Sequence, residues 1–390
     1  MTPGARTQAA IELLDAVIDA ARGGGAAADT LIARYFATRR YAGSKDRRAV
    51  RDLVYAAIRR AGEVPASGRS AMLAVAAEDA AVAATFDGST HAPAPIAAGE
   101  DAATGGIMPA WLAEALAASG IDADAQAALI DRAPLDIRVN RLRSDPAALA
   151  ARLGGTPIVG LPDALRLPTG TNLDALDGEA EVQDAGSQIV SLAVQAVPGQ
   201  RIVDLCAGGG GKTLALAAAM RNDGQILATD VDRGRLSRLM PRAERAGVGI
   251  VATRLLDPRR ELEALADWQG QADAVLIDAP CSGTGTWRRN PEARWRLTPA
   301  RLAAFTAQQR HVLDVGAALV RPGGGLVYVT CSLLDVEGAD QVAAFLAAHP
   351  DWRAEPLDLP AGSLRGQGVR LDPARDATDG FFVARLIRPC

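Results

Sequence analysis

A strand-like run that leads into four consecutive glycines constrains the fold of this chain more than any other feature. Residues 201–205 are typical of a buried strand, Gly208 to Gly211 form a turn, and Leu214 to Met220 repeat with helical periodicity. Glycines let a backbone approach a ligand that side chains would keep away, and the start of a helix offers it free N–H groups. The segment predicts a strand–loop–helix cradle for a nucleotide in an α/β fold.

An acidic residue suited to a ribose diol follows at the end of the next predicted strand. The run Gln225 to Thr229 leads directly into Asp230, about the offset expected for the second strand of such a unit. Asp232 is the main competitor for this role, and either carboxylate could cap a helix instead. We therefore expect Asp230 to bind the ribose hydroxyls.

Two other ligands compete for the glycine loop. A phosphate-binding loop of the G-x-x-x-x-G-K-[ST] type needs glycine where Cys206 stands, so Gly211-Lys212-Thr213 matches only half of it. A dinucleotide fold would place the loop near the start of its domain and would need a hydride-transfer site. S-adenosylmethionine, whose adenosine carries no phosphates, fits this loop better than either ligand.

Two cysteines stand just past the ends of predicted buried strands. Cys281 follows the apolar run 272–277, and Cys331 follows the run 325–329. In an open α/β sheet the chemistry lies outside the carboxyl ends of the strands, and neighbouring strands lie about 5 Å apart. We therefore expect both thiols to reach one substrate; two structural cysteines or a disulfide are the alternatives.

Three motifs carry a resemblance to a known family. D-A-P-C-S-G-T-G is intact from Asp278 to Gly285, T-C-S is intact at 330–332, and D-x-C-A-A-P-G-G-K-T appears at 204–213 with Gly208 and Gly209 replacing Ala-Pro. Residues 379–384 match a final D-G-F-F-x-A strand. The chain resembles the RsmB/NOP2/Sun family of RNA cytosine-5 methyltransferases, above all its bacterial ribosomal RNA branch.

The resemblance implies the domain organisation. It predicts an all-α NusB-like domain over 1–132, a small α+β RNA-binding subdomain over 133–178, and a Rossmann-like S-adenosylmethionine-dependent methyltransferase domain over 179–390. Periodicity independently predicts helices, and no strand between residues 4 and 61. The predicted helices cover residues 9–20, 27–39, 48–60, 71–84, 109–118 and 123–132.

The same resemblance implies a catalytic set. Cytosine carbon 5 is too electron-poor to attack a methyl sulfonium directly, so a thiolate must first add to carbon 6. Cys331 is the expected nucleophile, Cys281 assists release of the product, Asp278 binds the cytosine edge, and Lys212 lies near the cofactor and the base. DNA cytosine methyltransferases use the cysteine of a Pro-Cys motif, which by analogy favours Cys281 as the nucleophile instead. The base that removes the carbon 5 hydrogen is not assigned.

The expected contacts with S-adenosylmethionine come from three strand ends. Asp257 is predicted to lie at the adenine end, although an acid before proline is also common in turns without a ligand. Asp278 is expected to border the methionine portion. The full set of predicted cofactor residues is Cys206, Ala207, Gly208, Gly209, Gly210, Gly211, Lys212, Asp230, Asp257 and Asp278.

RNA binding must rely on local patches, because the net charge is −4. A cluster between Arg39 and Arg60 includes Arg47 and Arg48, and a solvated helix face is an equal alternative there. A second cluster mixes guanidinium groups with tryptophans directly after the Cys281 loop. Its predicted RNA contacts are Arg288, Arg289, Arg294 and Arg296.

Composition narrows the class of protein further. The four cysteines and three histidines stand too far apart for a disulfide framework or a zinc site, so no metal is expected. No apolar stretch is long enough to span a membrane, and we expect a cytoplasmic monomer. A non-catalytic RNA-binding or antitermination factor with a degenerate methyltransferase domain is the alternative, against which the intact motifs argue.

Overall fold

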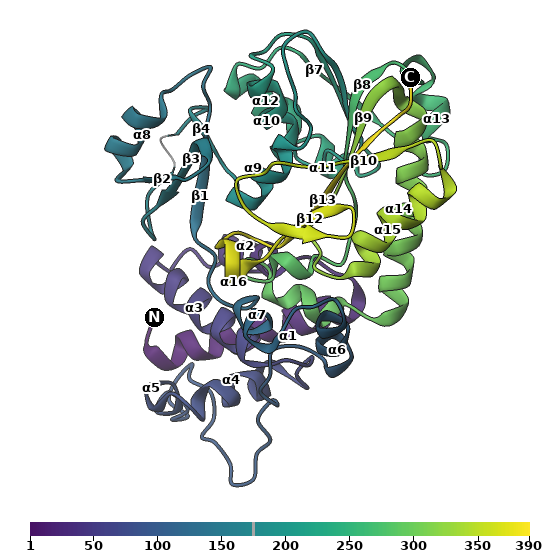
Figure 1. Cartoon of the computed structure of the whole chain (residues 1–390). Coiled ribbons are helices and arrows are strands. Elements are labelled where there is room, and N and C mark those ends of the chain that lie inside the picture. The colour runs from purple at the N-terminus through teal and green to yellow at the C-terminus, as the bar shows by residue number, and fades with distance from the viewer. Residues whose placement is uncertain (174–175) are drawn as a thin grey trace. The chain divides into compact units, whose positions relative to one another are not determined.

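The computed structural model describes residues 1–173 and 176–390 (Figure 1). Two residues of the predicted small subdomain, 174 and 175, lie outside the described part. The chain divides into two compact units. Unit 1 comprises residues 1–131 and 286–298, and unit 2 comprises residues 132–285 and 299–390.

Unit 1 is built from helices. Its buried core takes one apolar face from each long helix, for example Leu14 and Ile18 of the first and Val54 and Ile58 of the third. Thr2 caps the first helix and Ser67 closes a capping box on the fourth. The helices are α1 (Pro3–Gly23), α2 (Ala28–Ala37), α3 (Ser44–Arg60), α4 (Gly68–Ala76), α5 (Ala80–Ala83), α6 (Ala110–Ala118) and α7 (Ala123–Ala128).

These helices confirm the all-α prediction, and the unit fits a NusB-like domain. Among its described residues the only strand-like pairing is an isolated bridge between Ala61 and Gly105. The helix predicted over 71–84 is interrupted, because Asp79 leaves the helical conformation and caps α5. The helix predicted over 123–132 ends early, at Ala128.

One segment of unit 1 comes from far along the chain. Residues 286–298, which the predicted boundaries assign to the methyltransferase domain, pack with the helices and contain the 3-10 helix η3 (Pro291–Arg296). Trp295 is a member of the helical core, and its indole donates a hydrogen bond to Ala61 O at 3.0 Å. Unit 1 is therefore discontinuous in sequence.

Unit 2 begins with a small antiparallel sheet in the order β2-β3-β1-β4. One helix packs on it, and Ile137, Val139, Leu149 and Leu165 fill the space between them. The elements are β1 (Leu135–Val139), α8 (Pro146–Leu153), β2 (Thr156–Ile158), β3 (Leu161–Leu167) and β4 (Ala180–Val182). This matches the predicted small α+β subdomain, although it clusters with the larger sheet rather than apart from it.

The large sheet has the order β11-β12-β13-β9-β8-β5-β6-β7, with β10 paired to β13. The five strands from β9 to β7 are parallel, and β13 runs antiparallel to β9. The strands are β5 (Arg201–Asp204), β6 (Gln225–Asp230), β7 (Val251–Leu255), β8 (Ala272–Asp278), β9 (Val320–Thr330), β10 (Arg353–Glu355), β11 (Ser363–Arg365), β12 (Gly368–Leu371) and β13 (Phe381–Ile387).

Helices cover both faces of this sheet, which gives the predicted Rossmann-like, three-layer arrangement (Figure 1). The longer helices are α9 (Ala185–Leu192), α10 (Gly211–Ala219), α12 (Leu239–Ala246), α14 (Pro299–Leu319) and α15 (Ala339–Ala348). The short ones are α11 (Arg233–Leu236), α13 (Glu261–Ala264), α16 (Pro373–Asp376) and the 3-10 turns η1 (Ala266–Trp268), η2 (Thr284–Thr286) and η4 (Asp335–Glu337).

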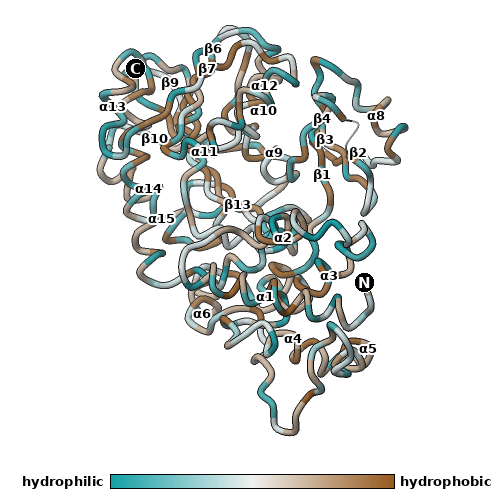
Figure 2. Tube along the Cα trace, turned by 180° about the vertical axis from the view of Figure 1, so that it is seen from behind, coloured by the Kyte–Doolittle hydropathy of each residue, from teal (hydrophilic) through white to brown (hydrophobic). Residues whose placement is uncertain are grey.

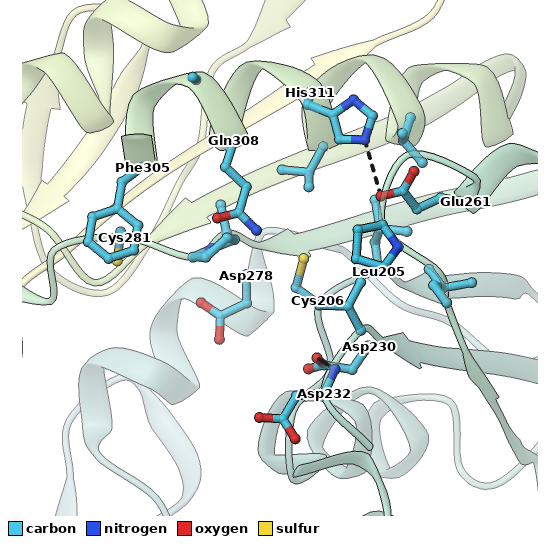
Figure 3. Close-up of a pocket in the computed structure, with 18 of the residues that line it drawn as sticks. Leu205, Cys206, Asp230, Asp232, Glu261, Asp278, Cys281, Phe305, Gln308 and His311 are labelled. Atoms are coloured by element: carbon cyan, nitrogen blue, oxygen red, sulfur yellow. Dashed lines mark hydrogen bonds and ion pairs between the residues drawn. The ribbon is translucent and has the colours of Figure 1, made fainter. Parts of the chain in front are cut away.

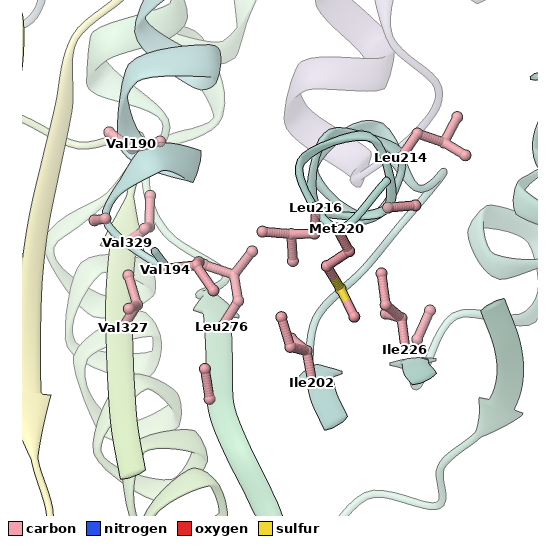
Figure 4. Close-up of a cluster of buried hydrophobic side chains, with 14 of the residues drawn as sticks. Val190, Val194, Ile202, Leu214, Leu216, Met220, Ile226, Leu276, Val327 and Val329 are labelled. Atoms are coloured by element: carbon pink, nitrogen blue, oxygen red, sulfur yellow. The ribbon is translucent and has the colours of Figure 1, made fainter. Parts of the chain in front are cut away.

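Alternate residues of each central strand enter opposite cores, as the strand period of two requires. Ile202 and Leu276 face the helices α9 and α10 (Figure 4), whereas Val203 and Val275 face α14 and α15. In Figure 2 hydrophobic residues run along these strands and hydrophilic residues gather in the loops. Among the described residues no helix has the length and apolar character needed to cross a membrane.

Candidate active site

A cavity of about 1100 Å³ opens at the carboxyl ends of the parallel strands in unit 2 (Figure 3). The strand order reverses between β5 and β8, which is the switch point where α/β sheets bind their ligands. Its lining includes residues from the ends of β5, β6, β8 and β9 and from one side of α14, namely Cys206, Asp230, Asp278, Cys281, Phe305, Gln308, His311 and Cys331.

The glycine loop turns sharply between β5 and α10. Gly210 precedes the helix with φ 85°, and a side-chain carbon there would lie 2.5 Å from Leu239 Cγ. Gly208 has φ 54°. Arg242 donates a hydrogen bond to Gly209 O and another, at 2.7 Å, to Glu181 Oε2. This loop needs glycine where the chain turns and where helix α12 approaches it.

Asp230 ends β6 and meets the loop. Its Oδ2 accepts a hydrogen bond from Gly208 N at 2.8 Å, and its Oδ1 accepts one from Asp232 N at 2.8 Å. Asp232 is the competing candidate for the ribose ligand. Its side chain accepts a hydrogen bond from Arg235 N and caps α11, which is a structural role. Both carboxylates line the cavity, whereas Asp257 is exposed and absent from the lining.

The cavity fits the adenosine part of S-adenosylmethionine. Val231, Leu256 and Ala279 give it apolar walls, and Asp230, the predicted ribose ligand, lines it as well. A second acid that the sequence did not single out also lines it: Glu261 Oε1 lies 3.1 Å from His311 Nε2, drawn as a dashed line in Figure 3. Backbone hydrogen bonds and His311 lower the pKa of Glu261 against the opposing effect of burial.

Lys212, the second residue of α10, pairs with Asp278 at the end of β8. The distance from Nζ to Oδ2 is 2.6 Å, and the Lys212 side chain is 10% exposed. Burial alone would lower the pKa of Lys212, but the Asp278 carboxylate outweighs it and raises that pKa. The ammonium also lies 5.3 Å from the Phe381 ring centroid.

The two predicted strand-end cysteines meet. Strands β8 and β9 are parallel neighbours, and the Sγ atoms of Cys281 and Cys331 lie 3.4 Å apart. Both thiols are free and line the cavity. The hydrogen bond with Cys331, and then burial, raise the pKa of Cys281 well above its usual value. Burial likewise raises the pKa of Cys206, which packs against the core of the sheet beneath the cavity.

Two buried acids next to the site were missed from the sequence as members of it. Glu337 bridges the two cysteine loops, accepting a 2.8 Å hydrogen bond from Ser282 N. Asp204 is fully buried, accepts a 2.7 Å bond from Thr213 Oγ1, and its pKa is raised by burial to about 7. Asp204 lies in the motif at 204–213, which is a signal that the sequence offers. Glu337 lies five residues after the T-C-S motif, and no sequence signal singles it out.

The arginine cluster after Cys281 is used inside unit 1. Arg294 is fully buried and donates hydrogen bonds to Pro291 O, to Ile58 O at 2.6 Å and to Ala61 O at 2.8 Å. It therefore satisfies carbonyls at the carboxyl end of α3, which a helix leaves unpaired. The prediction that Arg294 contacts RNA is wrong for this conformation, because no part of its side chain reaches the surface.

The other predicted RNA contacts differ in exposure. Arg296 donates to Gly25 O and Ala26 O, both at 2.6 Å, and Arg288 is 7% exposed. Arg289 is half-buried, whereas Arg47 and Arg48 are exposed on α3. Of the cluster between Arg39 and Arg60, the first half of α3 thus presents its cations to solvent. Among the described residues no group of three potential metal ligands occurs.

Comparison with known proteins gives one family. The sequence profile described as 16S rRNA methyltransferase RsmB/F matches residues 191–387. A protein named probable ribosomal RNA small subunit methyltransferase B from Synechocystis is 36% identical over 309 residues, covering 72% of this chain and 66% of its own length. Its namesake from Xanthomonas campestris is 37% identical over 293 residues, with the same coverage. The chain thus matches slightly less than two thirds of these relatives.

A solved structure resembles almost the whole chain. The crystal structure of PH0851 superposes with a TM-score of 0.78 at 26% identity, and the match covers 99% of each chain. The shared fold therefore extends beyond the region matched by the family profile.

Proposed function

This chain belongs to the RsmB/F family of 16S rRNA methyltransferases, and from that premise we propose that it methylates carbon 5 of a cytosine in small-subunit ribosomal RNA. The family depends on S-adenosylmethionine, which supplies an electrophilic methyl group when bound. The observation that carries the proposal is the pair of free thiols 3.4 Å apart at one wall of the cavity. In the proposed mechanism one thiol forms the covalent adduct and the second assists release of the product.

Cys331 is the proposed nucleophile. Its thiolate adds to carbon 6 of the cytosine, and carbon 5 then becomes electron-rich enough to accept a methyl group. Lys212 supports the charged thiolate, because its buried ammonium interacts electrostatically with Cys331. Asp278 is paired with Lys212 and partly exposed, and its proposed role is to accept a hydrogen bond from the amino edge of the base.

Cys281 is the proposed release group. After methylation a base removes the hydrogen from carbon 5, and the bond between Cys331 and carbon 6 breaks. The Cys281 thiol is held protonated by its neighbours, so it is available to exchange a proton with the departing Cys331 sulfur. The proposed contacts with S-adenosylmethionine are the loop from Cys206 to Lys212 together with Asp230 and Asp278. Asp257 stays a prediction from the sequence alone.

The substrate and setting of the reaction are also proposals. Arg47 and Arg48 are exposed cations on one helix, the form of surface that contacts RNA phosphates. We propose that the protein acts in the cytoplasm, where a ribosomal RNA substrate would be met. We also propose that a monomer acts, because every catalytic group named here belongs to one chain.

The test uses RNA from cells that lack this gene. Wild-type protein, Cys331→Ala and Cys281→Ala are incubated with that RNA and S-adenosylmethionine labelled in its methyl group. We expect transfer by the wild type only, loss of all activity in Cys331→Ala, and a covalent protein–RNA adduct in Cys281→Ala, seen as a shifted band on a denaturing gel. Bisulfite sequencing then identifies the modified cytosine.

Three outcomes would contradict the proposal. An adduct formed by Cys331→Ala instead would exchange the roles of the two thiols. Methylation at another atom would leave bisulfite resistance unchanged and would remove the carbon 5 assignment. No transfer by wild-type protein that still binds the RNA would favour the non-catalytic binding factor.

A further inference from the structure

Glu337 is a buried acid with no role in the chemistry described so far. Its side chain has no solvent exposure, and among the described residues no cation lies within ion-pair distance of it. Instead it accepts hydrogen bonds from Ser282 N at 2.8 Å, from Gln309 Nε2 at 3.1 Å and from Ser282 Oγ. An uncompensated buried carboxylate is costly, so three donors converging on one group mark a site built to hold negative charge.

The carboxylate sets the direction of a chain of hydroxyl groups. Ser282 Oγ also lies 3.1 Å from Ser332 Oγ, which in turn lies 3.1 Å from Thr284 Oγ1. A carboxylate only accepts, and each hydroxyl has one proton to donate. Ser282 therefore donates to Glu337, Ser332 donates to Ser282, and Thr284 donates to Ser332.

The hydrogen-bonded hydroxyl groups connect the two loops that carry the thiols. Ser282 is the next residue after Cys281, and Ser332 is the next residue after Cys331. Leu333 N and Leu334 N donate to Thr284 Oγ1 and Ser332 Oγ at 2.8 and 3.1 Å, so backbone as well as side chains is fixed. The 3.4 Å separation of the sulfur atoms thus depends on a network that ends at Glu337.

The charges around the two sulfur atoms differ in sign. Cys331 interacts with the Lys212 ammonium, whose own charge is balanced by Asp278. Cys281 contacts Cys331, and this hydrogen bond, burial and the charges of Cys331 and Glu337 all raise the pKa of Cys281, in that order. Tyr328 is a further titratable group that interacts with Cys281. Burial raises the pKa of Tyr328, so its side chain is neutral, and its hydroxyl donates to Glu337 O at 2.7 Å.

We propose that Glu337 is a positioning residue that joins the two cysteine loops and keeps Cys281 protonated while Cys331 carries the negative charge. This inference deepens the proposed function and rests on it for the roles of the two thiols. The Glu337 carboxylate adds to the effects of the hydrogen bond and of burial on Cys281, whereas the Lys212 ammonium acts on Cys331.

The decisive experiment measures thiol ionisation in the full chain without RNA or methyl donor. Wild type and Glu337→Gln are treated briefly with iodoacetamide between pH 6 and 10, and initial alkylation rates of Cys281 and Cys331 are read separately by peptide mass spectrometry. We expect Cys281 to be alkylated about tenfold faster in Glu337→Gln at each pH, because loss of the carboxylate charge lowers the pKa of Cys281 by about one unit and so raises its thiolate fraction. Cys390, which is free and exposed, is the internal reference in the same digest.

A charge-retaining variant separates charge from shape. In Glu337→Asp the alkylation rate of Cys281 should stay near that of the wild type, because the negative charge remains. An unchanged Cys281 rate in folded Glu337→Gln, or an equal rise in both variants, would overturn the electrostatic part of the proposal. Neither reading requires methyl transfer, so the proposed function can fail while this result stands, and the reverse.

A second variant tests positioning if Glu337→Gln does not fold. Ser282→Ala keeps the carboxylate but breaks the hydroxyl chain. Diamide converts two adjacent thiols to a disulfide, taking up their two hydrogen atoms to become a hydrazine. We expect Ser282→Ala to slow formation of the Cys281–Cys331 disulfide at least fivefold, and an unchanged rate would overturn the positioning role.

Discussion

Lys212 Nζ lies 2.6 Å from Asp278 Oδ2, so the end of the glycine loop and the end of β8 are joined by an ion pair at the floor of the site. Of the 42 basic residues in the chain, only Lys45 and Lys212 are lysines. The compact ammonium fits a position where the side chain is 10% exposed and where, in the proposed mechanism, it stabilises a second anion, the Cys331 thiolate. An arginine guanidinium is planar and wider than an ammonium, and its N–H donors point in fixed directions.

We expect Lys212→Arg to lower methyl transfer by roughly a hundredfold while leaving the fold intact. The loss should fall on kcat rather than on the affinity for RNA, because the ammonium acts on the charged thiolate. Steady-state methylation assays with unmodified ribosomal RNA measure both quantities. A variant as active as the wild type would show that any cation suffices here.

The main layers of the structure follow from local sequence signals. Strand β8 and the strand leading to Cys331 are mostly apolar runs, and the glycine turn before α10 marks a strand–loop–helix unit whichever ligand it binds. The meeting of Cys281 and Cys331 follows from one further assumption, that the two strands are neighbours. These features are predictable because each depends on a few adjacent residues.

Long-range partners were not predictable. Arg294 and Trp295 have the composition of an RNA-binding surface, and only the fold shows that carbonyls of α3 occupy the guanidinium. Glu337 is one acid among many in the sequence, and its contact with Ser282 spans 55 residues. Asp257 illustrates the converse: its local context suggested a ligand, but the turn leaves it exposed and outside the cavity lining.

Asp204 should make the protein less stable as the pH rises from 4 to 7. Its folded-state pKa is raised by burial from 3.8 to about 7, so within this range the unfolded chain loses a proton that the folded chain retains. The folded state is therefore penalised increasingly up to pH 7, and the penalty is constant above it. Its upper limit is roughly 4 kcal/mol, from about three pKa units at 1.36 kcal/mol each.

Asp204→Asn should remove this dependence, because the amide keeps an acceptor for Thr213 Oγ1 and does not ionise. Urea unfolding of both proteins at pH 5 and pH 8 gives the comparison. We expect the variant to gain stability relative to the wild type at both pH values, with the gain at pH 5 less than half of the gain at pH 8, because most of the penalty arises between pH 5 and pH 7. Parallel behaviour of the two proteins at both pH values would show that Asp204 is ionised in the fold.

Arg294→Lys should destabilise unit 1. The lysine ammonium cannot reach Pro291 O, Ile58 O and Ala61 O together, so buried carbonyls lose their donors. The expected loss is about 3 kcal/mol, since a fully buried charge also loses its partners. Thermal unfolding followed by circular dichroism should show a lower first transition.

The double variant Arg47→Ala with Arg48→Ala is the matched control, since both side chains are exposed on the surface of α3. We expect unchanged thermal unfolding but weaker RNA binding, with a smaller slope of log affinity against log salt, by about one per lost phosphate contact. If Arg294→Lys unfolds like the wild type, or if the double variant binds RNA normally, the division between buried and RNA-contacting arginines is wrong.

Arg242 should matter for cofactor affinity because it restrains the loosest part of the glycine loop. Gly208 and Gly209 stand where the family has Ala-Pro. The Arg242 guanidinium donates one hydrogen bond to Gly209 O and another, at 2.7 Å, to Glu181 Oε2. Removing this restraint lets two glycines sample more conformations, and they must be ordered again on binding.

We expect Arg242→Ala to weaken binding of S-adenosylmethionine about tenfold, equivalent to roughly 1.4 kcal/mol. Isothermal titration calorimetry should show the loss mainly as a less favourable entropy. Arg245→Ala is the matched control, because this exposed arginine lies on the same helix, one turn further from the loop. Equal affinities for the two variants would mean that the remaining bonds, such as Gly208 N to Asp230, are enough to order the loop.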